Sequence, residues 1–390
     1  MKFSLPPQLA NFIPPRKHLV IELIGTTVIA ILATIAIVFL RGEINRVEIE
    51  KSEAVRQLTK LQSEDQIVRN NTLEEEIKNI QSTFSNAATA YEELVKLREQ
   101  TKDTGKQDSL FATILSFLSK RNYASASADL SSLRQSITDE LTKVASSFTI
   151  PVNVPQSNTP PGSGYSRQSV SLDIGTYLVS MVAADMGSTR VIVDTASDNT
   201  CTNDCPVLSL ADYVSRNGAF AGVNGSYFCP ADYPSCADRK NSFDTLLMNK
   251  NKVYFNSDNN VYSTVPAVIF LSGSMRFVGK SLDWGRDTSP DGVIANQPLL
   301  VSGGNVVFGG DDDPKKGSKG NRSFVANRGA TAYIGVVHSA TVAESARVLQ
   351  ALGMENALNL DDGGSTALWS GGYKVGPGRN LPNVILFVGK

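Results

Sequence analysis

The residues with the clearest capacity for chemistry lie near the C-terminus, in the run Asp361-Asp362-Gly363-Gly364-Ser365-Thr366. This run follows the apolar segment "NALNL". Carboxylates can transfer protons, glycines let successive backbone N–H groups converge on an anion, and the two hydroxyls add donors. The composition fits a reactive loop at the end of a strand, and it fits equally a glycine-rich turn with solvated aspartates.

Two further motifs could belong to the same site. In "GVNGSYFCP" the amide of Asn224 could contact a ligand, and Gly225 would let the backbone approach it, although an Asn-Gly pair is first a turn signal. Arg328 in "NRGATAYIG" could clamp a phosphate or carboxylate, the alternative being a surface arginine in a loop. The catalytic candidates are Asp361 and Asp362. The substrate-binding candidates are Asn224, Gly225, Arg328, Gly363, Gly364, Ser365 and Thr366.

Other polar groups are weaker candidates. His338 closes the run "AYIGVVH" and could act as an acid or base, or it could be partly buried with a structural hydrogen bond. The cluster Asp311, Asp312 and Asp313 lacks the ordered ligand spacing of a calcium loop, which favours a solvated hairpin tip. No P-loop or dinucleotide fingerprint is present, and no cofactor is firmly implied. The net charge of -1 gives no argument for nucleic acid as a partner.

The elements that must position these residues begin at residue 169. From there to residue 390 the chain consists of short β-rich runs separated by glycine turns. One helix interrupts them: Thr341 and Glu344 form a capping-box pattern, and Gly353 stands where a helix-terminating glycine belongs. This pattern predicts a mixed, β-rich α+β catalytic domain with flanking helices.

An apolar segment near the N-terminus predicts a membrane anchor. Residues 19–40 contain one charged residue, Glu22, and a helix of about 1.5 Å per residue would cross a core of roughly 30 Å. The alternative is a cleaved signal peptide, but the run ends "FLRGE" without small residues at a cleavage site. We therefore favour a transmembrane helix, preceded by a cytoplasmic tail at residues 1–18.

The four cysteines bear on the orientation of this helix, because the basic residues on its two sides are equal in number. All four lie downstream, at Cys201, Cys205, Cys229 and Cys236. Neither spacing is typical of a metal site and no histidine is near, so we expect two short disulfide loops. Disulfides require an oxidising compartment, which places the C-terminal part outside the cytoplasm.

A helical stalk is expected at residues 43–148, followed by a Pro/Ser/Gly-rich linker at residues 149–168. Apolar residues recur with coiled-coil spacing, which indicates either a parallel coiled coil or a seam buried by the next helices of the chain. They are Leu73, Ile77, Ile80, Phe84, Ala87, Tyr91 and Leu94. An earlier seam is out of phase with this one, which indicates a helix break near Asn70 and Asn71.

The order of the motifs resembles the phosphodiester glycosidase family. "AFAGVNGSYF", "ANQPLLVSGG", "ATAYIGVV", a helix, "ALNLDDGGSTALW" and "LPNVILFV" succeed one another between residues 169 and 390. The resemblance implies hydrolysis of a sugar-1-phosphodiester at the anomeric carbon. Two positions depart from the family pattern: Asp362 replaces a glycine, and Thr331 stands where an arginine is usual, with Arg328 three residues earlier.

These observations predict an extracytoplasmic, membrane-anchored hydrolase that cleaves sugar-1-phosphodiester links in envelope glycans or a teichoic-type polymer. The architecture suggests a bacterial cell envelope. Asp361 is expected to activate water or stabilise the oxocarbenium-like centre. One alternative is a non-catalytic glycan-binding or scaffold protein that keeps the fold. Another places the main function in the helical stalk, as a module for homo-oligomerisation.

Overall fold

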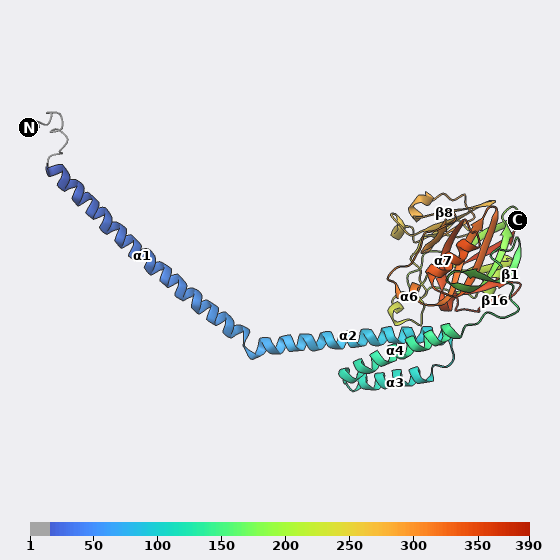
Figure 1. The fold of residues 1–390 in the computed structure, drawn as a ribbon, viewed down its shortest axis with the longest axis horizontal. Coiled ribbons are helices and arrows are strands. Elements are labelled where there is room, and N and C mark those ends of the chain that lie inside the picture. The colour runs from blue at the N-terminus through green and yellow to red at the C-terminus, as the bar shows by residue number, and fades with distance from the viewer. Residues whose placement is uncertain (1–15) are drawn as a thin grey trace, which may run out of the picture. The chain divides into compact units, whose positions relative to one another are not determined.

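The computed structural model describes residues 16–390, with side chains from residue 24 onward except that of residue 65. Most of the predicted cytoplasmic tail therefore lies outside the described residues. The chain divides into two compact units, Met1–Gln81 and Ser82–Lys390. The mixture of a helical N-terminal region and a β-rich C-terminal domain confirms the predicted fold class (Figure 1).

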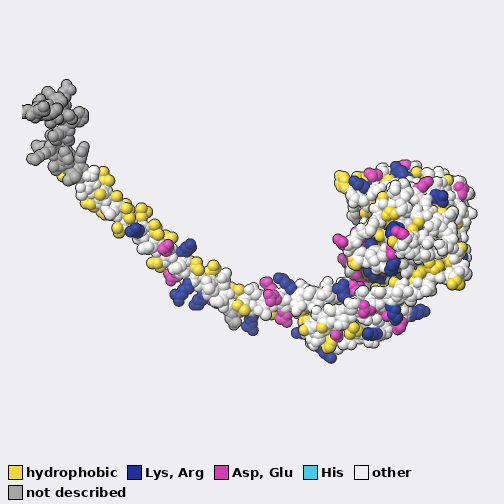
Figure 2. Space-filling view, in the orientation of Figure 1, with side chains coloured by type: hydrophobic (Ala, Val, Ile, Leu, Met, Phe, Trp, Pro, Cys, Tyr) yellow, Lys and Arg dark blue, Asp and Glu magenta, His cyan; other side chains and the backbone are white. Residues whose placement is uncertain are grey.

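The first unit contains helix α1 (Arg16–Gln62) and the beginning of α2 (Asp65–Gln100). From residue 24 onward the apolar side chains of α1 are exposed, as Figure 2 shows, and this part of the helix is long and apolar enough to cross a membrane. The helix breaks at residues 63–64, whereas Asn70 and Asn71 lie inside α2, so the break predicted there was wrong. Leu73 and Ile77 of the predicted seam are exposed.

The second unit begins with a three-helix arrangement of α2, α3 (Gly105–Ser119) and α4 (Tyr123–Ser147). The C-terminal part of the predicted seam is buried here against the next two helices. The shared core consists of Ala87, Ala90, Leu94, Leu97, Ile114, Leu118, Ala126, Leu130, Leu133 and Ile137. This part of the seam is thus filled by the chain's own helices, and self-association through a coiled coil stays a prediction.

Three antiparallel sheets build the β-rich domain. The seven-stranded sheet has the order β1-β2-β13-β12-β14-β10-β11. Its strands are β1 (Gly164–Leu172), β2 (Gly175–Asp185), β10 (Leu299–Ser302), β11 (Asn305–Val306), β12 (Gly320–Arg328), β13 (Thr331–Ala340) and β14 (Asn356–Asp362).

Two five-stranded sheets complete the domain. The C-terminal sheet, of order β16-β15-β4-β17-β3, comprises β3 (Thr189–Thr195), β4 (Ala221–Asn224), β15 (Leu368–Ser370), β16 (Tyr373–Val375) and β17 (Asn383–Gly389). The central sheet, of order β6-β5-β9-β7-β8, comprises β5 (Leu247–Met248), β6 (Tyr254–Phe255), β7 (Ala267–Leu271), β8 (Ser274–Val278) and β9 (Gly292–Ala295).

One hydrophobic core joins the three sheets. It includes Val182, Val325 and Leu358 of the seven-stranded sheet, Ile385 of the C-terminal sheet and Ile294 of the central sheet. Alternate strand positions point into this core because successive side chains of a strand face opposite ways. The packing fixes the strand ends from which polar residues project.

Short helices cover the outer faces. Helix α7 (Val342–Ala351) packs on the seven-stranded sheet and carries the predicted capping box of Thr341 and Glu344. Helix α5 (Leu210–Asn217) packs on the C-terminal sheet. The remaining turns are α6 (Pro314–Gly317), η1 (Pro234–Cys236), η2 (Asp258–Asn260), η3 (Ser281–Trp284) and η4 (Gly363–Ser365).

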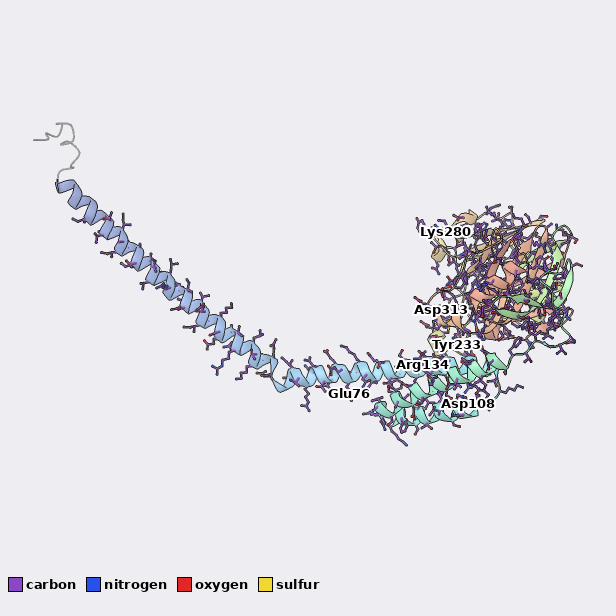
Figure 3. All side chains as sticks on the ribbon, in the orientation of Figure 1. Glu76, Asp108, Arg134, Tyr233, Lys280 and Asp313 are labelled. Carbon is purple, nitrogen blue, oxygen red and sulfur yellow. A yellow bond between two sulfur atoms is a disulfide. The ribbon has the colours of Figure 1, made fainter. Side chains whose placement is uncertain are left out.

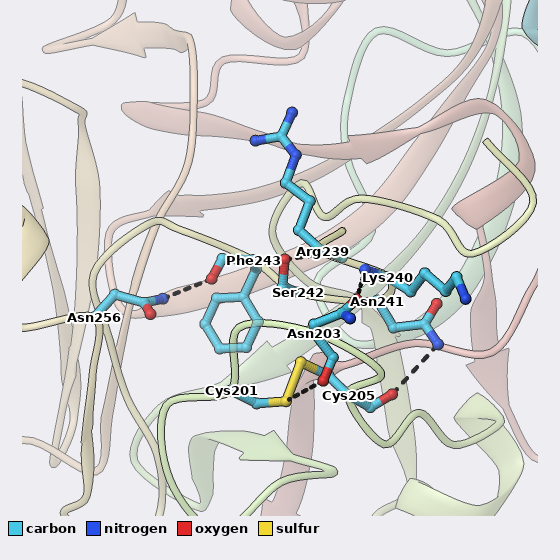
Figure 4. Close-up of a disulfide and its surroundings, with 9 residues drawn as sticks. All are labelled: Cys201, Asn203, Cys205, Arg239, Lys240, Asn241, Ser242, Phe243 and Asn256. Atoms are coloured by element: carbon cyan, nitrogen blue, oxygen red, sulfur yellow. Dashed lines mark hydrogen bonds between the residues drawn. A yellow bond between two sulfur atoms is a disulfide. The ribbon is translucent and has the colours of Figure 1, made fainter. Parts of the chain in front are cut away.

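Both predicted disulfide loops are present. Cys201 is bonded to Cys205 and Cys229 to Cys236. Around the first disulfide, Asn203 accepts a hydrogen bond of 2.8 Å from the Lys240 backbone, and Asn241 donates to the Cys205 carbonyl at 3.3 Å (Figure 4). The Asn241 N–H also donates to the Cys229 carbonyl at 2.6 Å, so hydrogen bonds link the two disulfide-bonded loops. Disulfides are typical of a protein that folds outside the cytoplasm.

Candidate active site

A β-bulge at the end of β14 brings two neighbouring carboxyl groups to one pocket. Phe324 of β12 pairs with Asn359, but Arg322, two residues earlier, pairs with Asp362. Strand β14 thus has one more residue than its partner in this interval. Side chains of adjacent residues in a regular strand point to opposite faces, and a bulge changes that direction. Asp361 and Asp362 consequently both line the same cavity.

The Asn-Gly turn lies behind these carboxyl groups and holds the backbone that carries them. Asn224 is fully buried and donates from Nδ2 to the Asp361 carbonyl at 2.7 Å. Its Oδ1 accepts hydrogen bonds from Ser323 Oγ at 2.8 Å and from the Ala367 backbone at 3.1 Å. With its amide engaged on both sides, Asn224 is a positioning residue for Asp361.

Gly225 completes this backbone connection. Its carbonyl accepts a hydrogen bond from the Asp361 N–H at 2.9 Å. A Cβ at position 225 would overlap the backbone and side chain of Asn383, so only glycine fits at this close approach. The structure therefore places Asn224 and Gly225 beside the site, and neither lines the cavity.

Asp362 is held on one side and free on the other. Its Oδ2 accepts hydrogen bonds from Arg322 Nη1 at 3.0 Å, Tyr227 Oη at 3.1 Å and Asn359 Nδ2 at 3.2 Å. Its Oδ1 is buried and has no hydrogen-bond partner among the residues described. Such an orphaned acceptor next to a cavity is available to a ligand that donates a hydrogen bond or carries positive charge.

Burial governs the protonation of this cluster. It raises the pKa of Asp361 to about 7, and the carboxyl of Asp362 acts in the same direction. Burial also raises the pKa of Asp362, although the charge of Arg322 and the hydrogen bonds to it oppose the change. The pKa of Tyr227 is raised by burial and by both carboxyl groups, so its phenol stays protonated and donates.

The cavity in front of the two carboxyl groups has a volume of about 330 Å³ and many charged walls. Its basic residues are Lys96, Lys315, Lys316, Lys319, Arg322 and Arg379, and its acidic residues are Glu99, Asp313, Asp361 and Asp362. Asp313 and Tyr233, both labelled in Figure 3, lie on loops that border the cavity. Such a site suits a ligand with negative charge and hydroxyl groups.

Helix α2 supplies one wall of the cavity through Lys96, Glu99 and Gln100. The Glu99 carboxylate forms an ion pair with Arg379 and lies so close to Gly364 that a Cβ there would overlap it. Burial raises the pKa of Glu99, while the charge of Arg379 and the Gly364 backbone oppose that change. The Gly363-Gly364 loop thus contacts an anionic group, which in this structure is the Glu99 carboxylate.

The loop of residues 229–236 is the part of the β-rich domain that packs against α2. Val95 packs with Tyr233 and Cys236 in a small apolar cluster. The Ser235 N–H donates to Glu92 Oε1 at 2.8 Å. The Cys229–Cys236 disulfide closes this loop, which therefore gives α2 a fixed surface to pack against.

The structure does not bring Arg328 to the cavity. Arg328 is exposed at the end of β12 and pairs with Thr331, whereas Arg322 at the other end of the strand contacts Asp362. Six residues of extended strand span about 20 Å. The arginine that meets the carboxyl groups therefore precedes the predicted one along the chain.

The other predicted residues have mixed positions. Gly363 and Gly364 line the cavity, Ser365 is buried beneath it, and Thr366 borders an adjoining hollow with Arg379. His338 accepts or donates a hydrogen bond with Ser180 Oγ at 3.0 Å, and burial lowers its pKa to about 4. The histidine is thus neutral and structural.

The acidic cluster at residues 311–313 was expected to be a solvated tip or a calcium loop. Asp313 caps α6 by accepting a hydrogen bond from the Lys315 backbone at 2.9 Å, and it borders the cavity. Within the described part of the chain, no three His, Cys, Asp or Glu residues are grouped to hold a metal ion. The segment's contribution to the cavity is mainly its lysines.

Sequence reasoning missed several residues of the cavity. Tyr227 lies within the motif "VNGSYF" that carries Asn224, and Arg322 lies six residues before Arg328. The lysines of "PKKGSKGNR" formed a visible basic run. Lys96 and Glu99 carried no signal, since nothing in a helical pattern tells which surface residues meet a distant domain.

The fold and the site define a β-rich domain with paired carboxyl groups in a basic cavity. A family model described as phosphodiester glycosidase matches residues 217–388, which confirms the resemblance seen in the motifs. The match supports a hydrolase of the glycosidase type. No curated protein matches the sequence.

Two solved structures are similar to part of the chain in fold. The zebrafish N-acetylglucosamine-1-phosphodiester α-N-acetylglucosaminidase catalytic domain, auto-inhibited by its pro-peptide, is 14% identical with a TM-score of 0.44. That comparison covers 60% of this chain and 85% of the other. A hypothetical protein from Synechocystis is 13% identical with a TM-score of 0.43, over 58% of this chain and 62% of that one. The chain therefore spans less than two thirds of the Synechocystis protein.

Proposed function

We propose that the protein hydrolyses sugar-1-phosphodiesters by breaking the bond between the anomeric carbon and the bridging oxygen. One observation carries the proposal: two adjacent buried carboxyl groups, Asp361 and Asp362, face a cavity rich in basic side chains. The family match over residues 217–388 supports the same reaction class.

Asp361 is the proposed base. With burial raising its pKa to about 7, it is ionised above neutral pH and basic enough to accept a proton from water. The water oxygen bonds to the anomeric carbon as the carbon–oxygen bond breaks. The phosphomonoester leaves with the electrons of that bond. Because this leaving group is weakly basic, it needs little protonation, and basic side chains can stabilise its charge.

Asp362 is the proposed stabiliser of the sugar. Its Oδ2 is fixed by Arg322, Tyr227 and Asn359, while its Oδ1 has no partner among the described residues. A carboxylate held in this way can face the positive charge that develops at the anomeric centre. The Asp that departs from the family pattern is thus given a role in the chemistry.

The cellular setting forms part of the proposal. Helix α1 would anchor the protein in a membrane, and the disulfide-bonded domain would lie outside the cytoplasm, with the N-terminus inside. The substrate would then be a sugar-phosphate bond in an envelope glycan or a related polymer. A bacterial envelope suits this architecture.

An oxygen-18 experiment tests the reaction. The full chain in detergent micelles is assayed for release of free sugar from a panel of sugar-1-phosphodiesters in H2-18O. Cleavage at the anomeric carbon places the label in the sugar, whereas attack at phosphorus places it in the phosphate. If the wild type and Asp361→Asn release no sugar from any substrate of a broad panel, the enzymatic proposal fails.

The alternative is a glycan-binding protein without turnover, and Thr331 at the family's usual arginine position favours it. In that case glycans would bind to the full chain with an affinity that survives Asp361→Ala. The oxygen-18 assay would show no label in either product.

A further inference from the structure

The basic side chains of the cavity differ in whether their charge is already balanced. Four of them form ion pairs with a carboxylate of the protein. These pairs are Lys316 with Asp311, Lys319 with Glu344, Arg322 with Asp362, and Arg379 with Glu99. Two basic residues remain, Lys96 and Lys315.

Lys96 and Lys315 reach the cavity from two elements far apart in the sequence. Lys96 lies near the end of α2, where its ammonium lies 5.9 Å from the centre of the Tyr233 ring. Lys315 lies in α6. Among the residues that the structure describes, neither ammonium group takes part in an ion pair or a hydrogen bond. Both belong to the same cavity as the two catalytic candidates.

The protein holds these two positive charges close enough to repel each other. Burial lowers the pKa of Lys96, and the charge of Lys315 acts in the same direction. The carboxylates of Glu92, Glu93 and Glu99, one turn away on the same helix, oppose the change. Lys96 is half-buried and Lys315 is exposed. Because their positive charges repel each other, an anion that binds between them would be stabilised by both.

The positions of both lysines are built into the fold. Helix α2 is fixed against the disulfide-closed loop by the Val95–Tyr233 contact and by the Ser235–Glu92 hydrogen bond. Arg322 Nη2 donates to the Lys315 carbonyl at 3.1 Å, which connects α6 to the carboxyl group of Asp362. Separate contacts therefore hold the backbone of each lysine beside the same cavity.

We propose that Lys96 and Lys315 together bind the phosphate of the substrate. The inference rests on the proposed function, because the phosphate of a sugar-1-phosphodiester becomes the leaving group of that reaction. The Glu99 carboxylate already contacts the glycine loop and forms an ion pair with Arg379. A phosphate could therefore bind Lys96 and Lys315 without breaking an ion pair of the protein. Helix α2 lies outside residues 217–388 and completes the site of the domain that the family model matches.

Direct binding of inorganic phosphate tests the inference. Isothermal titration calorimetry is performed on the full chain in detergent micelles, at pH 7.5 and low salt. Lys96→Met and Lys315→Met keep the apolar stem and remove the charge. Each should weaken phosphate binding by about tenfold, the worth of one charge-assisted hydrogen bond. Lys120→Met, at an exposed lysine after α3, is the matched control and should bind like the wild type.

Further measurements separate the inference from the proposed function and from damage to the fold. Lys96→Arg should restore binding to within about threefold of the wild type, since the charge returns. Asp361→Asn should lose hydrolysis and keep phosphate binding. If no substrate is hydrolysed but phosphate binding depends on Lys96 and Lys315, the subsite stands and the proposed reaction fails. If both methionine variants bind phosphate as the wild type does, with unchanged melting temperatures, the subsite is refuted.

Discussion

Two buried carboxyl sites of the β-rich domain have opposite electrostatic characters. Asp194, at the end of β3, accepts hydrogen bonds at Oδ2 from Arg216 at 2.8 Å, Asn217 at 2.5 Å and Lys250 at 3.2 Å. Burial alone would raise the pKa of Asp194, but these hydrogen bonds and charges outweigh it and hold the pKa below its ordinary value. Burial raises the pKa of Asp361 to about 7 because no comparable set of cations faces it.

The difference separates a carboxylate that stabilises the fold from one that we propose to be reactive. Asp194 has its charge balanced by two cations, so its ionised form stabilises the fold. Asp361 is buried next to a second carboxyl group, so ionising it lowers the stability of the folded protein. The same environment raises its pKa and makes the carboxylate a stronger base. Both carboxyl groups are buried, and they differ in the number of cations and hydrogen-bond donors that balance the negative charge.

The largest expected effect is on catalysis. Asp361→Asn should lower kcat for a sugar-1-phosphodiester by about 1,000-fold, because general-base catalysis typically contributes factors of 10² to 10⁴. The measurement is initial rates of sugar release at pH 8. Asp312→Asn, at an exposed aspartate near the cavity, should stay within about twofold of the wild type. A kcat for Asp361→Asn above a tenth of the wild-type value would remove Asp361 from the mechanism.

The second effect concerns stability. Asp194→Asn should lower the free energy of unfolding by about 3 kcal/mol at pH 7, since it breaks a buried ion pair. The low folded-state pKa makes Asp194 stabilising above its unfolded pKa, and this stabilisation is lost as the pH falls. The deficit of the variant, followed by denaturant unfolding, should therefore shrink below about pH 4. Asp198→Asn is the exposed control, and equal stability of the two variants would contradict the comparison.

The third effect separates the two ends of β12. Arg322→Met should lower kcat/KM by about 100-fold, because Asp362 loses its cation and the Lys315 segment loses a hydrogen bond. Arg328→Met at the exposed end should change kcat/KM by less than about twofold. The measurement is steady-state kinetics well below the melting temperature of each variant. If Arg328→Met lost more kcat/KM than Arg322→Met, Arg328 would be the residue that binds the phosphate, as the sequence predicted.

The smallest effect is a gain in stability. The raised folded-state pKa means that native Asp361 binds its proton more tightly than unfolded Asp361, so stability falls as the pH rises from about 4 to 7. Asp361→Asn removes this cost and should be more stable than the wild type by about 2 kcal/mol at pH 8. Thermal unfolding at pH 4.5 and pH 8 should show the gap closing at the lower pH. A variant less stable than the wild type at pH 8 would indicate that Asp361 is balanced as Asp194 is.

Local patterns predicted what local physics decides. The capping box of Thr341 and Glu344, both short disulfide loops and the β-rich character of the domain follow from neighbours in sequence. The order of the motifs also indicated the family. The roles of Asn224 and Arg328 depend instead on long-range contacts: which strand passes behind a turn, and which end of β12 meets β14.

The contribution of helix α2 to the cavity was the feature that the sequence predicted least. Lys96 and Glu99 belong to a helical segment whose apolar spacing indicates only which face is buried. Arg379 forms the ion pair with Glu99, and Lys315 lines the same cavity as Lys96; both are more than two hundred residues away from α2 in sequence. Such pairings arise from the packing of the helix on the loop at residues 229–236, which no periodicity encodes.

The extra residue of β14 has a consequence for how this site can change. Because side chains alternate along a strand, removing one residue between Asn359 and Asp361 would restore a regular ladder with β12. One carboxyl group would then be turned toward the apolar interior, where it would be uncharged or would unfold the strand. A single-codon deletion, with no change of residue type at either aspartate, would thus dissolve the pair. The arrangement of the two carboxyl groups therefore depends on the number of residues in β14 as much as on the identity of those residues.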